Sequence, residues 1–241
     1  MYKIIKNTTI STLLLLIMPT ISWIINWHWS LNNNEIILKM LYYITLTIEL
    51  PWGIFITIFL NSLFLWYLQF NKKNSLKLII LICTIILIGQ GIKSFIKIYI
   101  KEPRPFTVLF KKNNNFNNKS FYFLYIKNNN LFIKNIFTNK KLIPNWLYKY
   151  WKYENNSSFP SGHTLFAVTW ALLGSGLLWS NHHYKTVISL MLWALIIMES
   201  RLILGMHWPK DLLVSILISW FLVIIMYWLA HIWFKLLILL K

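Results

Sequence analysis

The stretch at residues 200–211, Ser-Arg-Leu-Ile-Leu-Gly-Met-His-Trp-Pro-Lys-Asp, joins the last two of several long apolar segments. It places Arg201, His207 and Asp211 at the junction of these segments. Ionisable side chains beside apolar segments are costly to keep there, so they indicate a functional site. We therefore predict two membrane-spanning helices with a polar site where they meet.

Apolar segments also dominate the rest of the chain. Hydrophobic residues make up 57% of the 241 residues and charged residues 12%, whereas soluble domains have about 45–50% and about 25%. A helix needs about 20 apolar residues to cross a bilayer. Six segments approach that length: 10–27, 51–70, 78–98, 163–179, 187–204 and 211–234. We predict an all-α membrane protein: a six-transmembrane-helix bundle forming one domain over 1–241, with an extramembrane loop subdomain at 99–159 between the third and fourth helices.

The lysines of the short loops and of the termini predict how this bundle is oriented. They lie on the side of the membrane that six spans assign to both termini: Lys3, Lys6, Lys72, Lys73, Lys77, Lys185, Lys235 and Lys241. Lysine and arginine in short loops favour the cytoplasmic side. We expect both termini in the cytoplasm, and the 99–159 loop and the 205–210 turn on the outer face.

Composition also excludes several classes of protein. Cys83 is the single cysteine, so an intrachain disulfide framework and a cysteine-based zinc site are excluded. The net charge of +18 would suit nucleic acid, but many of the lysines fit the AT-rich codon bias that the many Asn and Ile residues also indicate. No nucleic-acid-binding motif is present. We predict no nucleic-acid partner, and no obligate protein partner is evident.

Two further polar clusters lie where predicted spans meet the outer face. Lys97 and Arg104 are seven residues apart, about two helical turns, so they could share a helix face, and Pro103 and Pro105 are expected to end the helix there. Arginine offers a planar fork of donors to phosphate oxygens, as does Arg201, and lysine adds a point charge. Ser161 and Gly162 precede the fourth span, where backbone N–H groups and the helix dipole favour an anion. Together these residues predict a cradle for a phosphoryl group.

Two histidines complete the predicted chemistry. Asp211 follows His207 by four residues, and Pro209 is suited to the first position of the sixth helix. The carboxylate would accept a proton from one imidazole nitrogen of His207 and leave the other nitrogen free to attack phosphorus. His163 would protonate the leaving oxygen and then activate water. This scheme passes through a phosphohistidine and requires no metal and no cofactor.

The three clusters resemble the signature motifs of the type 2 phosphatidic acid phosphatase superfamily, K-x6-R-P, P-S-G-H and S-R-x5-H-x3-D. Every polar position matches: Lys97, Arg104, Ser161, His163, Arg201, His207 and Asp211. Motif spacing and the large loop are most similar to bacterial members of the inner (cytoplasmic) membrane. The resemblance implies that membrane lipids are the substrates, namely phosphatidylglycerophosphate, undecaprenyl pyrophosphate and phosphatidic acid.

Each residue taken singly has an ordinary alternative. Lys97 and Arg104 could be interfacial snorkelling residues, and His207 with Asp211 could cap a helix. Three rival functions also stay open: a lipid A or other lipid phosphatase or phosphotransferase, a vanadate haloperoxidase, and a non-catalytic lipid-binding protein or transporter. Outside the motifs, Lys93 is interpreted as snorkelling or as lining a lipid-entry groove, Glu154 as a possible head-group contact, and Glu49 as an interfacial residue.

Overall fold

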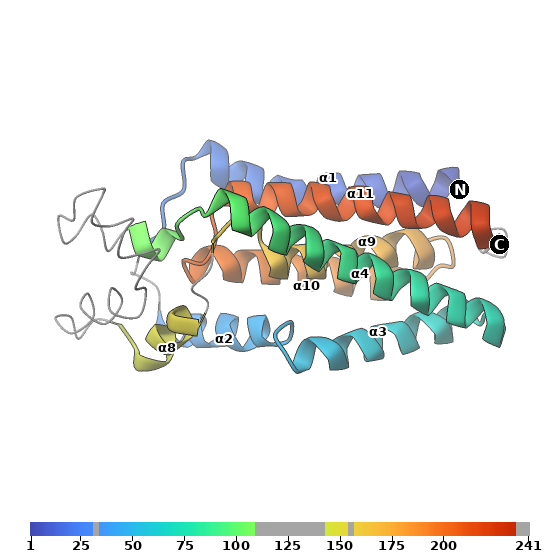
Figure 1. Cartoon of the computed structure of the whole chain (residues 1–241), viewed down its shortest axis with the longest axis horizontal. Coiled ribbons are helices and arrows are strands. Elements are labelled where there is room, and N and C mark those ends of the chain that lie inside the picture. Colours follow the sequence, from blue (N-terminus) through green and yellow to red (C-terminus); the bar gives the residue numbers. More distant parts are fainter. Residues whose placement is uncertain (31–33, 109–142, 154–156, 235–241) are drawn as a thin grey trace.

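The computed structural model describes residues 1–30, 34–108, 143–153 and 157–234, and within them all regular structure is helical (Figure 1). The helices are α1 (Tyr2–Ile24), α2 (Glu35–Leu46), α3 (Trp52–Leu68), α4 (Lys72–Ile100), α8 (Asn145–Tyr153), α9 (Gly162–Leu178), α10 (Tyr184–Ile203) and α11 (Pro209–Phe234). The all-α prediction is confirmed.

Six of these helices match the predicted apolar segments to within a few residues, except that α1 and α4 begin earlier. Four of them, α1, α4, α10 and α11, are long and apolar enough to cross a membrane. The other two, α3 and α9, are apolar but have 17 residues each. At 1.5 Å per residue, a helix of that length spans roughly 25 Å, which is less than the roughly 30 Å of a typical hydrocarbon core.

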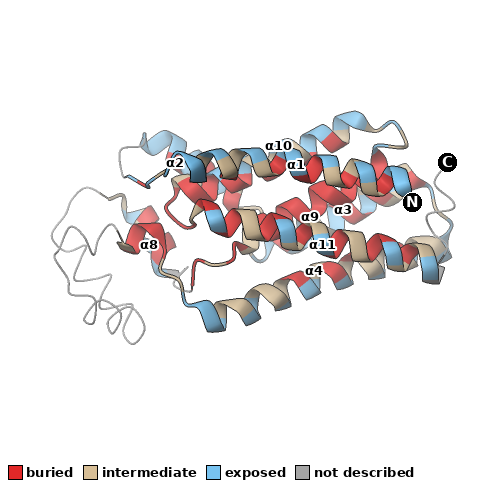
Figure 2. Cartoon of the chain, turned by 90° about the horizontal axis from the view of Figure 1, so that it is seen from above, coloured by how far each residue is buried: buried red, intermediate tan, exposed pale blue. Residues whose placement is uncertain are grey.

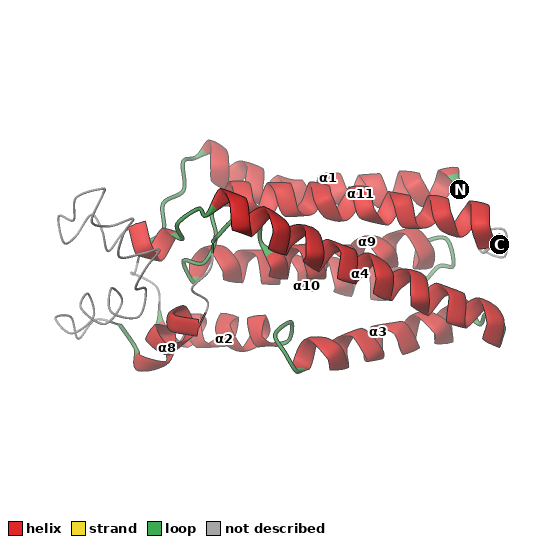
Figure 3. Ribbon diagram, viewed as in Figure 1, coloured by secondary structure: helices red, strands yellow, loops and turns green. Residues whose placement is uncertain are grey.

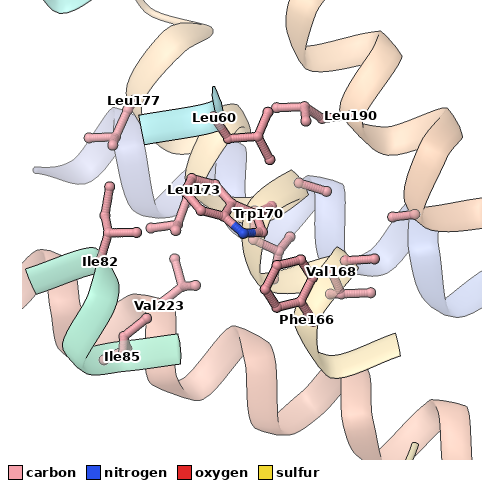
Figure 4. Packing of buried hydrophobic residues seen from close by; sticks show 14 of the residues in the cluster. Leu60, Ile82, Ile85, Phe166, Val168, Trp170, Leu173, Leu177, Leu190 and Val223 are labelled. Carbon is pink, nitrogen blue, oxygen red and sulfur yellow. The ribbon is translucent and has the colours of Figure 1, made fainter. Parts of the chain in front are cut away.

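Helix α9 forms the centre of the bundle. It packs against α10, α11, α1 and α4, and its residues from Thr164 to Leu178 are all buried (Figure 2). A helix that is apolar on every side is stable only when other helices surround it. Trp170 lies at the middle of this core (Figure 4). Its ring meets that of Phe64 edge to face, with 5.5 Å between the ring centroids. Because its neighbours hold α9 in place, the positions of its first residues, Gly162 and His163, are also set.

The outer faces of the bundle are apolar. Large hydrophobic side chains are exposed on α1, α4 and α11, among them Leu13, Leu87 and Phe221. Soluble monomers rarely expose such continuous apolar surface. Together with the long apolar helices, these faces identify a membrane protein.

Two short helices lie at one end of the bundle and were not anticipated individually. Helices α2 and α8 pack there around an aromatic cluster that contains Trp29, Phe106 and Trp151. The rings of Phe106 and Trp151 stack at 4.7 Å. Of the predicted 99–159 subdomain, residues 109–142 and 154–156, including Glu154, lie outside the described residues.

One local prediction was wrong. Helix α4 ends at Ile100, and the left-handed Lys101 caps it at φ 35°. Arg104 follows in the next segment, so it does not share a helix face with Lys97. Pro103 and Pro105, which flank Arg104, have no N–H to continue a helix, which explains why the backbone turns before this arginine.

Candidate active site

The loop between α10 and α11 carries His207 and is fixed by hydrogen bonds to its backbone. The indole N–H of Trp29 donates to Ile203 O at 2.7 Å, and that of Trp151 donates to Leu204 O at 2.9 Å. Arg104 Nη1 donates to Met206 O at 3.1 Å. Figure 3 shows the loops at this end of the bundle. Because three separate segments of the chain donate hydrogen bonds to the loop after α10, its backbone conformation before His207 is fixed.

Gly205 makes that path possible. Its φ is +70°, and a Cβ atom built on it would lie 2.7 Å from Cε2 of Trp29. A left-handed backbone conformation is costly for residues with a Cβ atom. The turn then returns the chain to the end of α10, where the N–H groups of Met206 and His207 both donate to Arg201 O.

Asp211 contacts one ring nitrogen of His207. Its Oδ2 lies 3.3 Å from His207 Nδ1, and it accepts the N–H of Trp208 at 2.9 Å. Both side chains are almost completely buried. The contact assigns Nδ1 of His207 to the carboxylate and leaves Nε2 as the nitrogen that can meet a reacting group.

The neighbouring charges that shift the pKa of His207 are positive. Its pKa lies well below the ordinary value of 6.5, chiefly because the ring is buried, and the charges of Arg104, Arg201, Lys97 and His163 lower it further. The structure thus brings the predicted cationic residues around one imidazole. At neutral pH that imidazole is uncharged, so Nε2 keeps its lone pair.

The two arginines are held by contacts from other parts of the chain. Arg201 is fully buried, and its Nη1 donates to Thr45 Oγ1 at 3.1 Å and to the Tyr150 hydroxyl. Arg104 is buried against the His207 loop through Met206 O. Glu199, a possible ion-pair partner for Arg201 by sequence position, lies on an exposed part of α10.

Ser161 caps the N-terminus of α9. Its Oγ accepts the Thr164 N–H at 3.4 Å and the Thr164 hydroxyl at 2.9 Å. Its own N–H donates to Ser215 Oγ on α11 at 2.9 Å. That N–H is engaged within the protein, which corrects the expectation that it would be free for an anion. Gly162 comes next, and a Cβ atom there would lie 2.6 Å from Cδ of Lys93.

Backbone contacts join the segment after α4 to the segment before α9. Ser158 N donates to Glu102 O at 2.8 Å, and Glu102 N donates to Ser157 Oγ at 2.9 Å. Lys210 Nζ lies 2.5 Å from Glu102 Oε1. All three predicted clusters therefore meet at one end of the bundle (Figure 3).

His163, on the first turn of α9, faces Glu49. The distance from His163 Nε2 to Glu49 Oε1 is 3.5 Å, and 12% of the histidine side chain is exposed. Glu49 lies in the turn between α2 and α3. The interfacial interpretation of Glu49 missed this contact because 114 positions separate it from His163, and no spacing pattern links them.

A cavity of about 930 Å³ extends from this site along α3 and α4. Its polar lining includes Glu49, Lys93, Lys97, His163 and His207. Its apolar lining comes from α3, α4, α9 and the turn before α3: Ile48, Leu50, Ile54, Ile58, Ile86, Leu87 and Phe166. Lys93, for which snorkelling was the favoured interpretation, lines the cavity and hydrogen-bonds Gln90 Oε1 at 2.6 Å. A cavity that is polar at one end and apolar along its length suits an amphiphile.

Within the part of the chain that the structure describes, no group of three or more His, Cys, Asp or Glu side chains is arranged to hold a metal ion.

The structure is an apolar helical bundle with a buried histidine that cationic side chains surround. These features define an integral-membrane protein that binds an anionic amphiphile. The chain belongs to the PAP2 superfamily, whose sequence profile matches residues 77–235. It is 41% identical to phosphatidylglycerophosphatase B of Escherichia coli K12 over 231 residues, which cover 96% of this chain and 91% of that protein. It is 33% identical to phosphatidylglycerophosphatase B of Haemophilus influenzae over 226 residues, covering 89% and 91%.

These comparisons confirm the resemblance found in the motifs. They make the chain an enzyme, a lipid phosphatase of the PAP2 superfamily. The predicted residues supply the site described above.

Proposed function

We propose that the protein hydrolyses phosphatidylglycerophosphate, undecaprenyl pyrophosphate, or both, through a phosphohistidine on His207. The observation that carries the proposal is the buried His207, which is held through Nδ1 by Asp211 and surrounded by cations. The names of the relatives, phosphatidylglycerophosphatase B, support the first substrate. The second substrate, undecaprenyl pyrophosphate, has a terminal phosphoryl group for the polar end of the cavity and a long apolar tail for its apolar length.

In the first step, the lone pair on His207 Nε2 forms a bond to phosphorus while the bond from phosphorus to the leaving oxygen breaks. His163 gives its proton to that oxygen, so the lipid leaves as an alcohol or as a lipid monophosphate. Lys97, Arg104 and Arg201 stabilise the charge on the phosphoryl oxygens, together with the first-turn N–H of Gly162.

In the second step, His163 takes a proton from water, and the resulting oxygen attacks phosphorus. The nitrogen–phosphorus bond breaks, inorganic phosphate leaves, and His207 returns to its neutral form. His163 and His207 line the same cavity, which supports a division of roles between them.

We further propose that all six long helices span the bacterial inner membrane, with the site on the outer face and both termini in the cytoplasm. The N-terminus and the end of α11 lie at the end of the bundle opposite α8 and the site (Figure 1). The described lysines near that opposite end, Lys3, Lys6, Lys72, Lys73, Lys77 and Lys185, follow the positive-inside rule. An outward site suits recycling of a carrier lipid released on that side.

The test measures phosphate release by the purified protein in detergent with EDTA, from each of the two lipids. We expect turnover by the wild type and loss of activity in His207→Ala. His28→Ala is the matched control, because this exposed histidine lies outside the site. A folded wild type that is inactive on both lipids, or an active His207→Ala variant, would overturn the proposal.

The intermediate is tested separately with lipid labelled at the phosphorus. Rapid quenching under alkaline conditions should trap label on the wild type and not on His207→Ala. Because phosphohistidine is labile in acid, an acid-quenched sample provides the control. Label that persists through acid would indicate another nucleophile.

A further inference from the structure

The protein has few carboxylates, and those that the structure describes have distinct environments. The sequence contains six acidic residues, and all but Glu154 are described. Four of the five described ones have settled positions: Glu35 pairs with Lys39, Glu102 pairs with Lys210, Glu199 is exposed, and Asp211 contacts His207 and Trp208. The fifth, Glu49, faces His163 inside the cavity.

Glu49 is also surrounded by other titratable groups. Lys93, Lys97 and Cys83 reach the cavity from α4, and His207 reaches it from the loop before α11. On α2, Tyr42 has a raised pKa, mainly because it is partly buried and also because of the negative charge of Glu49. The Glu49 side chain is 28% exposed, so a ligand that enters the cavity can meet it without displacing the fold.

A general acid must carry its proton when substrate arrives. Cations crowd this site, and positive charge disfavours an imidazolium. The charge of His163 therefore needs a nearby anion, and Asp211 is already committed to His207. Glu49 Oε1, at 3.5 Å from His163 Nε2, is the described carboxylate at the right distance.

We propose that Glu49 is a positioning residue that holds His163 as an imidazolium facing the cavity. The inference rests on the proposed function, because it assumes that His163 is the general acid. The proton passes from His163 to the leaving oxygen and is restored from water in the second step.

This role predicts a dependence on the leaving group. A glycerol alkoxide is a poor leaving group and needs the proton from His163, whereas p-nitrophenolate leaves without one. Glu49→Gln should therefore lower kcat/KM about tenfold for dioctanoyl phosphatidic acid and less than twofold for p-nitrophenyl phosphate. The parameter kcat/KM is used because it reports steps up to leaving-group departure and not the hydrolysis of the phosphohistidine.

Two further variants separate positioning from a structural effect. Glu49→Asp keeps the charge and should recover part of the rate on phosphatidic acid. In a His163→Ala background, Glu49→Gln should cause no further loss, since the two residues act as one unit. Thermal unfolding of each variant in detergent should show that the fold is intact.

Equal losses on both substrates, or a further loss in the His163→Ala background, would overturn the role of Glu49. So would a gain of activity in Glu49→Gln, which would mark the contact as inhibitory. The proposed function fails differently: His207→Ala would then retain activity whatever the result at Glu49.

Discussion

His207 is subject to two influences, one on the orientation of its ring and one on its charge. Asp211 fixes the orientation of the ring, while burial and the neighbouring cations keep it neutral. A protonated imidazole has no lone pair for phosphorus, so activity should fall only when the pH drops through the lowered pKa of His207. The acid limb of kcat/KM, which reports the free enzyme, should therefore lie below pH 6.5.

A phosphate monoester substrate also titrates near pH 6, and this ionisation can itself produce an acid limb in the pH profile. Two substrates with different phosphate pKa values are therefore needed to tell the two causes apart. A limb that belongs to His207 stays at the same pH for both. Lys97→Met should move the limb upward, because the charge of Lys97 lowers the pKa of His207. A limb at or above pH 6.5, or one that Lys97→Met shifts downward, would contradict this account.

At the same scale, sequence spacing could identify the motif residues but not their supports. Asp211 is four positions from His207, so their contact is local in the sequence and could be predicted, although His207 itself lies in the loop before α11. The hydrogen-bond partners of Arg201, Thr45 and Tyr150, are 156 and 51 positions away. Nothing in local periodicity signals such pairs, because they depend on how α2 and α8 pack against the bundle.

At the scale of elements, the loop before α11 is the most constrained segment of the site. Gly205→Ala should destabilise the protein by about 2 kcal/mol, since Ala is strained at φ +70° and its Cβ would meet the indole of Trp29. The shift of the loop should also lower activity. Thermal unfolding and phosphate release in detergent measure both effects.

Gly91→Ala is the matched control. It lies within α4, and no atom would be within 4 Å of the added Cβ. Alanine favours a helix over glycine by about 1 kcal/mol, so this variant should be neutral or slightly more stable. Comparable losses in the two variants would show that the strain at Gly205 is not the cause.

The apolar helices themselves could be predicted closely, because continuous hydrophobic runs identify membrane helices with little ambiguity. Helices α2 and α8 could not. Each is short and carries a mixture of polar and aromatic residues, and it is their packing around Trp29 and Trp151 that stabilises them.

At the scale of the whole molecule, the proposed topology separates two exposed lysines. Lys149 lies on α8 at the site end, and Lys185 lies at the start of α10 at the opposite end. In a Cys83→Ser background, an impermeant maleimide added to intact spheroplasts should label Lys149→Cys and not Lys185→Cys. Permeabilised cells should label both. The reverse pattern would invert the orientation, and labelling of both in intact spheroplasts would contradict a membrane between them.

The packing of α1 has a consequence for biosynthesis. This helix contacts α11 and α9, although it is the first of the helices to leave the ribosome and α11 is the last. Until α11 is inserted, the α1 surface that it covers has only lipid or a chaperone as a neighbour. Closure of the bundle therefore awaits the synthesis and insertion of α11, and a nascent chain that stalls before α11 leaves this surface of α1 without its partner helix.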